Sequence, residues 1–121
     1  MTLTNITNIA NIAGRVLVAA VFILAGGAKI AGPAPFLAHM DRFEVPRWLL
    51  PAVIALEVGG GIGLLMGWRL PISAGAVAAF CLATALVFHR NLGDRVERAQ
   101  FFKDLALAGA LTVIAASAMS A

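Results

Sequence analysis

The sequence predicts an all-α, polytopic membrane protein, namely a four-helix bundle with a short interfacial helix between spans one and two. Of its 121 residues, 61% are hydrophobic and 12% are charged, whereas about a quarter of a soluble domain is charged. Four apolar stretches are each long enough to cross about 30 Å of hydrocarbon as a helix. These stretches are continuous and do not alternate, which excludes a β-barrel. We therefore expect a single transmembrane domain over residues 1–121 and exclude a soluble enzyme or a disordered chain.

The four spans are expected over residues 12–31, 48–68, 70–88 and 101–120. The second span has Trp48 and Trp68 at its ends, as expected for an aromatic side chain at each membrane interface. Only a tight turn separates the second and third spans, so they form an antiparallel hairpin. Between the first two spans, Phe36, Met40 and Phe43 recur at helical spacing, which predicts a short helix at the membrane surface.

Lysines and arginines are divided unequally between the two ends of the predicted bundle. Seven are expected at the end formed by the first and third connections: Lys29, Arg42, Arg47, Arg90, Arg95, Arg98 and Lys103. The end with both termini has two, Arg15 and Arg69. Cytoplasmic loops carry an excess of lysine and arginine, so both termini are expected in the periplasm. The net charge of +3 is thus an orientation signal, and no arginine-rich patch indicates a nucleic-acid partner.

Glu57 is the charged residue expected nearest the middle of the membrane. A charge at that depth is costly, so Glu57 is expected to face the bundle interior, together with Gly61, and to have a partner. If Lys29 and Trp48 mark one boundary, Arg15 is level with Glu57 to within about 7.5 Å and Lys29 is nearly twice as far. Arg15 is therefore the expected partner. Two roles stay open for the carboxylate: a structural ion pair, or a proton relay or ligand-binding group.

A polar cluster is expected at the cytoplasmic mouth of the bundle. Lys29, His89 and Lys103 would meet there beside Asp104, in an arrangement suited to a quinone carbonyl or an anionic head group. The alternative is that these side chains only extend to the interface and cap helix ends. The candidate ligand-binding residues are therefore Glu57, Arg15, Lys29, His89 and Lys103.

No catalytic residue and no metal site are predicted. Cys81 is the single cysteine, which excludes an intrachain disulfide and a CxxC motif. Haem is not expected, because His39 lies outside the spans and haem normally needs facing histidines within helices. No cofactor follows from the residues alone, and quinone is the candidate that the polar cluster suggests.

The order of several motifs along the chain resembles the DoxX family. The matching segments are RVLVAAVF at 15–22, GGAK at 26–29, EVGG at 57–60, LLMG at 64–67 and FFKDLA at 101–106. Asp104 stands where the family usually has asparagine. The resemblance covers residues 14–111 and implies a small bacterial inner-membrane protein of four helices. It also implies relatives associated with thiosulfate:quinone oxidoreduction and with membrane complexes for oxidative and thiol stress.

Three functions therefore stay open. The first is a quinone-interacting or partner-docking subunit of a membrane redox or oxidative-stress system, which would need a soluble or membrane redox protein as partner. The second is a structural or assembly factor without catalysis, and the third is a small transporter acting as a homo-oligomer. No self-contained catalytic motif is present, so an oxidoreductase-associated subunit is the most that the sequence supports as an enzyme.

Overall fold

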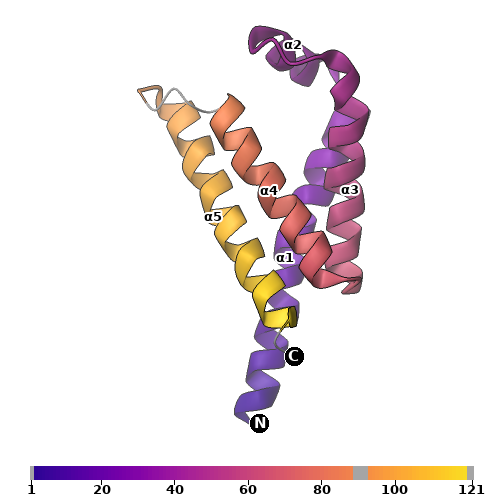
Figure 1. Cartoon of the computed structure of the whole chain (residues 1–121), viewed down its shortest axis with the longest axis vertical. Coiled ribbons are helices and arrows are strands. Elements are labelled where there is room, and N and C mark those ends of the chain that lie inside the picture. Colours follow the sequence, from indigo (N-terminus) through magenta and orange to yellow (C-terminus); the bar gives the residue numbers. More distant parts are fainter. Residues whose placement is uncertain (1, 89–92, 120–121) are drawn as a thin grey trace.

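The structure is a computed structural model, and all the regular secondary structure of its described residues is helical (Figure 1). It describes residues 2–88 and 93–119. The helices are α1 (Leu3–Ala31), α2 (Ala34–Arg42), α3 (Leu50–Met66), α4 (Leu70–Phe88) and α5 (Arg95–Met119), with a 3-10 turn η1 (Arg47–Leu49) before α3. Four segments are long and apolar enough to cross a membrane: α1, η1 with α3, α4 and α5. The predicted fold class, including the short helix between the first two spans, is confirmed.

Two helices begin earlier than the hydrophobic spans that the sequence predicts. The hydroxyl of Thr2 accepts a hydrogen bond from the backbone N–H of Asn5 at 3.2 Å, so α1 begins nine residues before the apolar run. The carboxylate of Asp94 accepts one from the N–H of Glu97 at 3.0 Å and so caps α5. Both are ordinary N-caps, which satisfy backbone donors that the first helical turn leaves free. The capped first turns of α1 project beyond the rest of the bundle (Figure 1).

A tight turn joins α3 to α4, as the sequence predicts. Gly67 ends α3 with φ of 75°, a left-handed conformation that costs glycine little. The N–H groups of Gly67 and Trp68 both donate to the carbonyl of Gly63, so carbonyls at the helix end keep partners. Ser73, in the first turn of α4, donates its hydroxyl to the carbonyl of Trp68 at 2.8 Å and fastens the hairpin.

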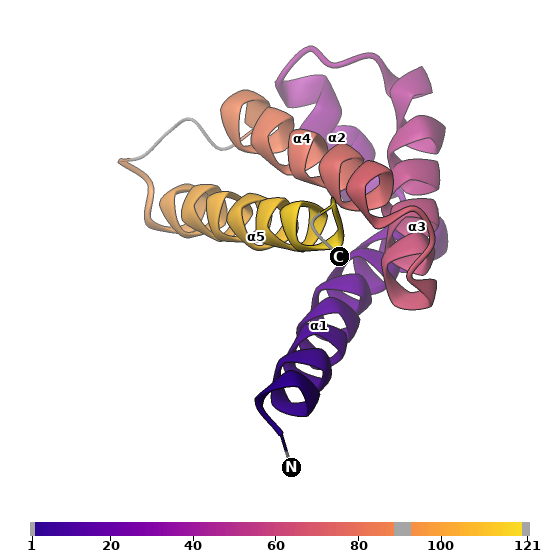
Figure 2. The same cartoon turned by 60° about the horizontal axis from the view of Figure 1, so that its bottom comes forward.

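The bundle consists of two closely packed helix pairs, α1 with α3 and α4 with α5. The pairs meet mainly where α3 packs on α4, and α1 touches α5 little. They converge toward the end that holds both chain termini and diverge toward α2 (Figures 1 and 2). The core includes Ala19, Phe22, Leu64, Ala74, Val77, Ala78, Cys81, Ala108 and Leu111. Cys81 is therefore a packing residue, in agreement with its position among alanines.

Candidate functional site

A cavity of about 860 Å³ lies between the two helix pairs, at the end of the bundle nearer α2. All five helices contribute to its wall. Most lining side chains are apolar, and the polar ones include Lys29, Glu57, Gln100, Lys103 and Asp104. A largely apolar cavity of several hundred Å³ with a few convergent polar groups is the usual form of a small-molecule site. The candidate functional site is therefore this cavity.

Lys29 and Glu57 form an ion pair in the cavity wall. Lys29 Nζ lies 2.8 Å from Glu57 Oε1, and the two side chains are 16% and 3% exposed. The ammonium of Lys29 also lies 4.7 Å from the centre of the Phe36 ring, which attracts it through the negative face of the ring. One cation thus connects α1, α2 and α3 at the edge of the cavity.

A glycine on α1 makes this pairing geometrically available. A Cβ added to Gly26 would lie 3.3 Å from Glu57 Cβ and 3.3 Å from the backbone nitrogen of Val58, so the two helices are in close contact there. Lys29 follows Gly26 by three residues, which returns its side chain to the same helical face. Its ammonium therefore reaches the carboxylate about one turn away.

The prediction that Arg15 pairs with Glu57 is wrong. Gly26, and not Arg15, is level with Glu57, and eleven residues of helix place Arg15 about 16 Å away along the axis. The guanidinium of Arg15 instead lies beside Gly67, at the far end of α3. The error came from placing Lys29 level with Trp48. Gly26 is level with Glu57 and α1 runs antiparallel to α3, so Lys29 is level with about residue 54 of α3. Lys29 therefore lies about two helical turns further from the α2 end of the bundle than Trp48.

The second polar wall of the cavity comes from α5. Lys103 and Asp104 both line the cavity; Lys103 is exposed, whereas Asp104 is only 8% exposed. Of the predicted site residues, Lys29, Glu57 and Lys103 therefore line one cavity, and Arg15 lies outside it. His89 lies outside the described residues. A binding role for any of these residues stays a prediction.

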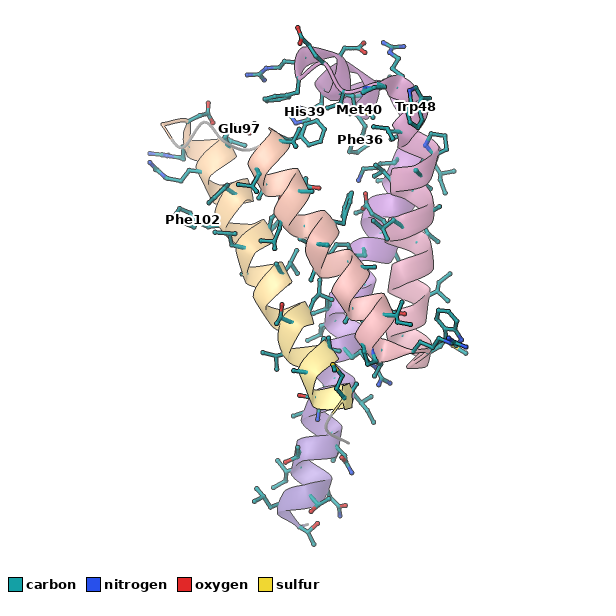
Figure 3. The ribbon with its side chains drawn as sticks, in the orientation of Figure 1. Phe36, His39, Met40, Trp48, Glu97 and Phe102 are labelled. Carbon is teal, nitrogen blue, oxygen red and sulfur yellow. The ribbon has the colours of Figure 1, made fainter. Side chains whose placement is uncertain are left out.

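Helix α2 covers the end of the cavity, a contribution that the sequence did not reveal. Phe36, His39 and Met40 line the cavity from this helix and lie below it in Figure 3. His39 stacks on Phe88 with ring centroids 5.0 Å apart, and Phe43 packs edge-on against the same ring at 5.4 Å. The spacing of Phe36, Met40 and Phe43 indicated a helix, but its docking on α4 is a long-range contact that spacing alone does not show.

A salt bridge holds the C-terminal end of α2 to η1. Arg47 Nε donates to both carboxylate oxygens of Asp41, at 3.0 and 3.1 Å, and its Nη2 also bonds Oδ2. These hydrogen bonds, with the positive charge of Arg47, lower the pKa of Asp41 below its usual value. Both side chains are exposed, so the pair positions α2 and contributes little to overall stability.

Two comparisons with known proteins agree with this architecture. The model of the DoxX family matches residues 10–90, a segment that includes both Lys29 and Glu57. The inner membrane protein YqjF of Escherichia coli (strain K12) is 39% identical over 101 residues, which cover 84% of this chain and 78% of that protein. No solved structure matches.

Proposed function

The chain belongs to the DoxX family as an integral, multi-pass inner-membrane protein, and we propose that it is a quinone-binding subunit of a membrane redox or oxidative-stress system. The observation that supports the proposal is the cavity of about 860 Å³ with Lys29, Glu57 and Lys103 in its wall. Charges inside a membrane protein are costly and are usually kept for a function. Here they face a cavity large enough for a ring with attached hydrocarbon.

The residues of the cavity fit a quinone chemically. A quinone is a flat apolar ring with two carbonyl oxygens, which accept hydrogen bonds but donate none. An ammonium group has three donors, so Lys29 keeps two after bonding Glu57. Lys103 supplies further donors from the opposite wall. When bound, a quinone supplies the electron and proton acceptor, and these lysines would orient its carbonyl oxygens and stabilise negative charge on them.

The proposed function requires a second, redox-active protein as partner. The polar residues of the cavity can bind and orient a quinone, but nothing in the sequence is a self-contained catalytic motif. Electrons would therefore come from, or pass to, a second protein. Arg42, Arg47, Arg95 and Arg98 surround the α2 end of the bundle, and this is the end nearest the cavity. A partner docked there would be close to the bound ring.

The test is direct binding by the purified chain in lipid nanodiscs. Native mass spectrometry should detect one ubiquinone per chain after extraction from membranes or after addition. The variants Lys29→Met and Lys103→Met should each weaken binding, because each removes hydrogen-bond donors from the cavity. Ala79→Phe is the control, since Ala79 is exposed and does not line the cavity. Absence of any bound ubiquinone, with the fold intact, would overturn the proposal.

One observation favours the second candidate, a structural or assembly factor. Lys29 and Glu57 already neutralise each other, so these two charges need no ligand to be accommodated. Under this alternative, charge substitutions reduce stability and the yield of a partner complex but never change the amount of bound quinone. Measuring both quantities on Glu57→Gln separates the two functions.

We also propose the orientation, with both termini in the periplasm and α2 on the cytoplasmic side. The N-terminal end of α1 and the C-terminal end of α5 lie at the same end of the bundle (Figure 1), as an even number of spans requires. The excess of lysine and arginine at the opposite end supports a cytoplasmic assignment for that end. A green fluorescent protein fused after Ala121 should be dark and an alkaline phosphatase fusion active. The reverse result would reverse the orientation.

A further inference from the structure

Helices α3 and α4 share one continuous seam, but they are in contact along only part of it. Near the hairpin, a Cβ added to Gly63 would lie 2.7 Å from Ser73 Oγ. One turn further, a Cβ on Gly60 would meet the side chain of Val77. At both levels glycine lets the second helix approach closely, as is usual for helices packed within lipid.

Beyond Gly60 and Val77 the same seam opens into the cavity. The next seam positions, at spacings of three and four residues, are Leu56, Val53 and Leu49 on one side and Phe80, Thr84 and Val87 on the other. Every one of these six residues lines the cavity. The faces of α3 and α4 that would continue the helix contact are thus separated by the cavity. All of these six side chains except that of Thr84 are apolar.

Two alanines mark the edge of this opening. Ala52 of α3 and Ala83 of α4 line the cavity and are also exposed, which places them where the cavity meets the surrounding lipid. The other side of the cavity, between α1 and α5, has a different edge. There the exposed lining residues include the charged Lys103. The exposed lining residues there also include Val21, Ala28 and Val96, so this edge is mixed. The α3–α4 edge differs because none of its exposed lining residues, among those that the structure describes, is charged. The open part of the α3–α4 seam therefore offers a hydrocarbon chain the more apolar path.

We infer that the cavity binds a lipid-phase molecule whose polar ring lies near Lys29 and Lys103, and whose hydrocarbon chain leaves between α3 and α4, past Ala52 and Ala83. The inference rests on the proposed quinone site and specifies its ligand class, a prenylated molecule taken directly from the bilayer. Lipid is as apolar as the seam, so the chain gains no hydrophobic free energy on leaving the bilayer. It contributes to binding through close packing against the side chains of the seam. Binding should therefore depend on the chain as well as on the ring.

The test compares two ligands in the same nanodiscs, ubiquinone-0, which has no chain, and ubiquinone-2, which has two isoprene units. Ala52→Phe and Ala83→Phe narrow the edge of the seam, and Ala55→Phe and Ala79→Phe are matched controls on the same two helices. Both controls are exposed positions that do not line the cavity. The added phenylalanine ring would overlap the chain, and overpacking of this kind should weaken ubiquinone-2 binding about tenfold in the edge variants. Ubiquinone-0 should bind all variants equally, and the controls should bind both ligands as the unmodified chain does.

The outcomes separate this inference from the proposed function. If both ligands bind and the edge variants leave ubiquinone-2 affinity unchanged, the path through the seam is overturned while the quinone site stands. If neither ligand binds the unmodified chain, both proposals fail. Because each ligand is compared only between variants, its partitioning into the lipid cancels.

A second measurement needs no variant and so does not depend on the stability of one. A ubiquinone analogue with a photoreactive diazirine on its chain should label peptides containing residues 49–56 or 80–88 of the unmodified chain. Labelling confined to residues 21–29 or 96–107 would instead show that the chain leaves between α1 and α5. That result would overturn the inference.

Discussion

The two ends of the bundle are packed in different ways. Toward the hairpin and the chain termini, which we call the closed half, glycines at 60, 61 and 63 bring α3 into contact with α4 and α1. Toward α2, the open half, larger side chains face each other across the cavity and the buried ion pair lies in its wall. Lipid is as apolar as the helix surfaces, so small residues that allow close packing decide where helices join. Beyond these glycines α3 and α4 diverge, and polar residues line part of the cavity between them.

The largest expected effect comes from breaking the ion pair of the open half. Glu57→Gln leaves the Lys29 ammonium without its buried counter-charge, which typically costs about 3–5 kcal/mol. The melting temperature in detergent should therefore fall markedly. The double variant Lys29→Gln/Glu57→Gln should recover part of the loss, because no uncompensated charge remains. A double-mutant cycle by thermal unfolding measures this coupling.

The control for that cycle is Arg15, which the sequence indicated and the structure places elsewhere. Arg15→Gln combined with Glu57→Gln should give the sum of the two single effects, since the two residues are about three turns apart, Arg15 beside Gly67 and Glu57 beside Lys29. Strong coupling of Glu57 to Arg15, with none to Lys29, would contradict the register of α1 and α3.

This comparison also shows which parts of the molecule the sequence could predict. Hydrophobic length and the turn residues determine the helices locally, so the fold class, the α3–α4 hairpin and the inward direction of Glu57 were predictable. The partner of Glu57 depends on the vertical register of α1 against α3. That register is determined by close contacts at Gly26 and Gly61 and by where Gly32 ends α1. The assumption that Lys29 and Trp48 lie at the same membrane boundary does not reproduce it. The cavity depends on where the α3–α4 seam opens, which no single stretch of sequence encodes.

The next prediction concerns the closed half, where added volume should be harmful. A Cβ on Gly61 would lie 2.7 Å from Ile23 Cγ1 and 3.2 Å from the backbone oxygen of Ala19, so α1 would have to move away. Overpacking of this kind costs about 1–3 kcal/mol. Gly61→Ala should therefore lower the free energy of unfolding, measured by titration with sodium dodecyl sulfate.

Gly59 provides the matched control two residues away. An added Cβ there meets nothing within 4 Å, and alanine favours a helix over glycine by up to about 1 kcal/mol. Gly59→Ala should leave stability unchanged or raise it slightly. Equal losses from Gly59→Ala and Gly61→Ala would mean that the closed half is not held by close approach at specific glycines.

The smallest expected effect is at α2, which covers the end of the cavity in the open half and is held to η1 by the salt bridge between Asp41 and Arg47. Hydrogen bonds from Arg47 lower the pKa of Asp41 from its usual 3.8, so the folded state binds this proton less readily than the unfolded state. The stabilisation is therefore complete above the usual pKa and is lost as the pH falls through the lowered one. Hydrogen-exchange protection of the α2 amides should be constant from about pH 7 to 5 and should decline below about pH 4. Asp41→Asn should lower the protection at neutral pH and remove this decline, whereas Glu44→Gln, a substitution in the adjacent turn, should preserve it. If Asp41→Asn declined with the same profile as the unmodified chain, another group would be responsible and the salt bridge would not be what anchors α2.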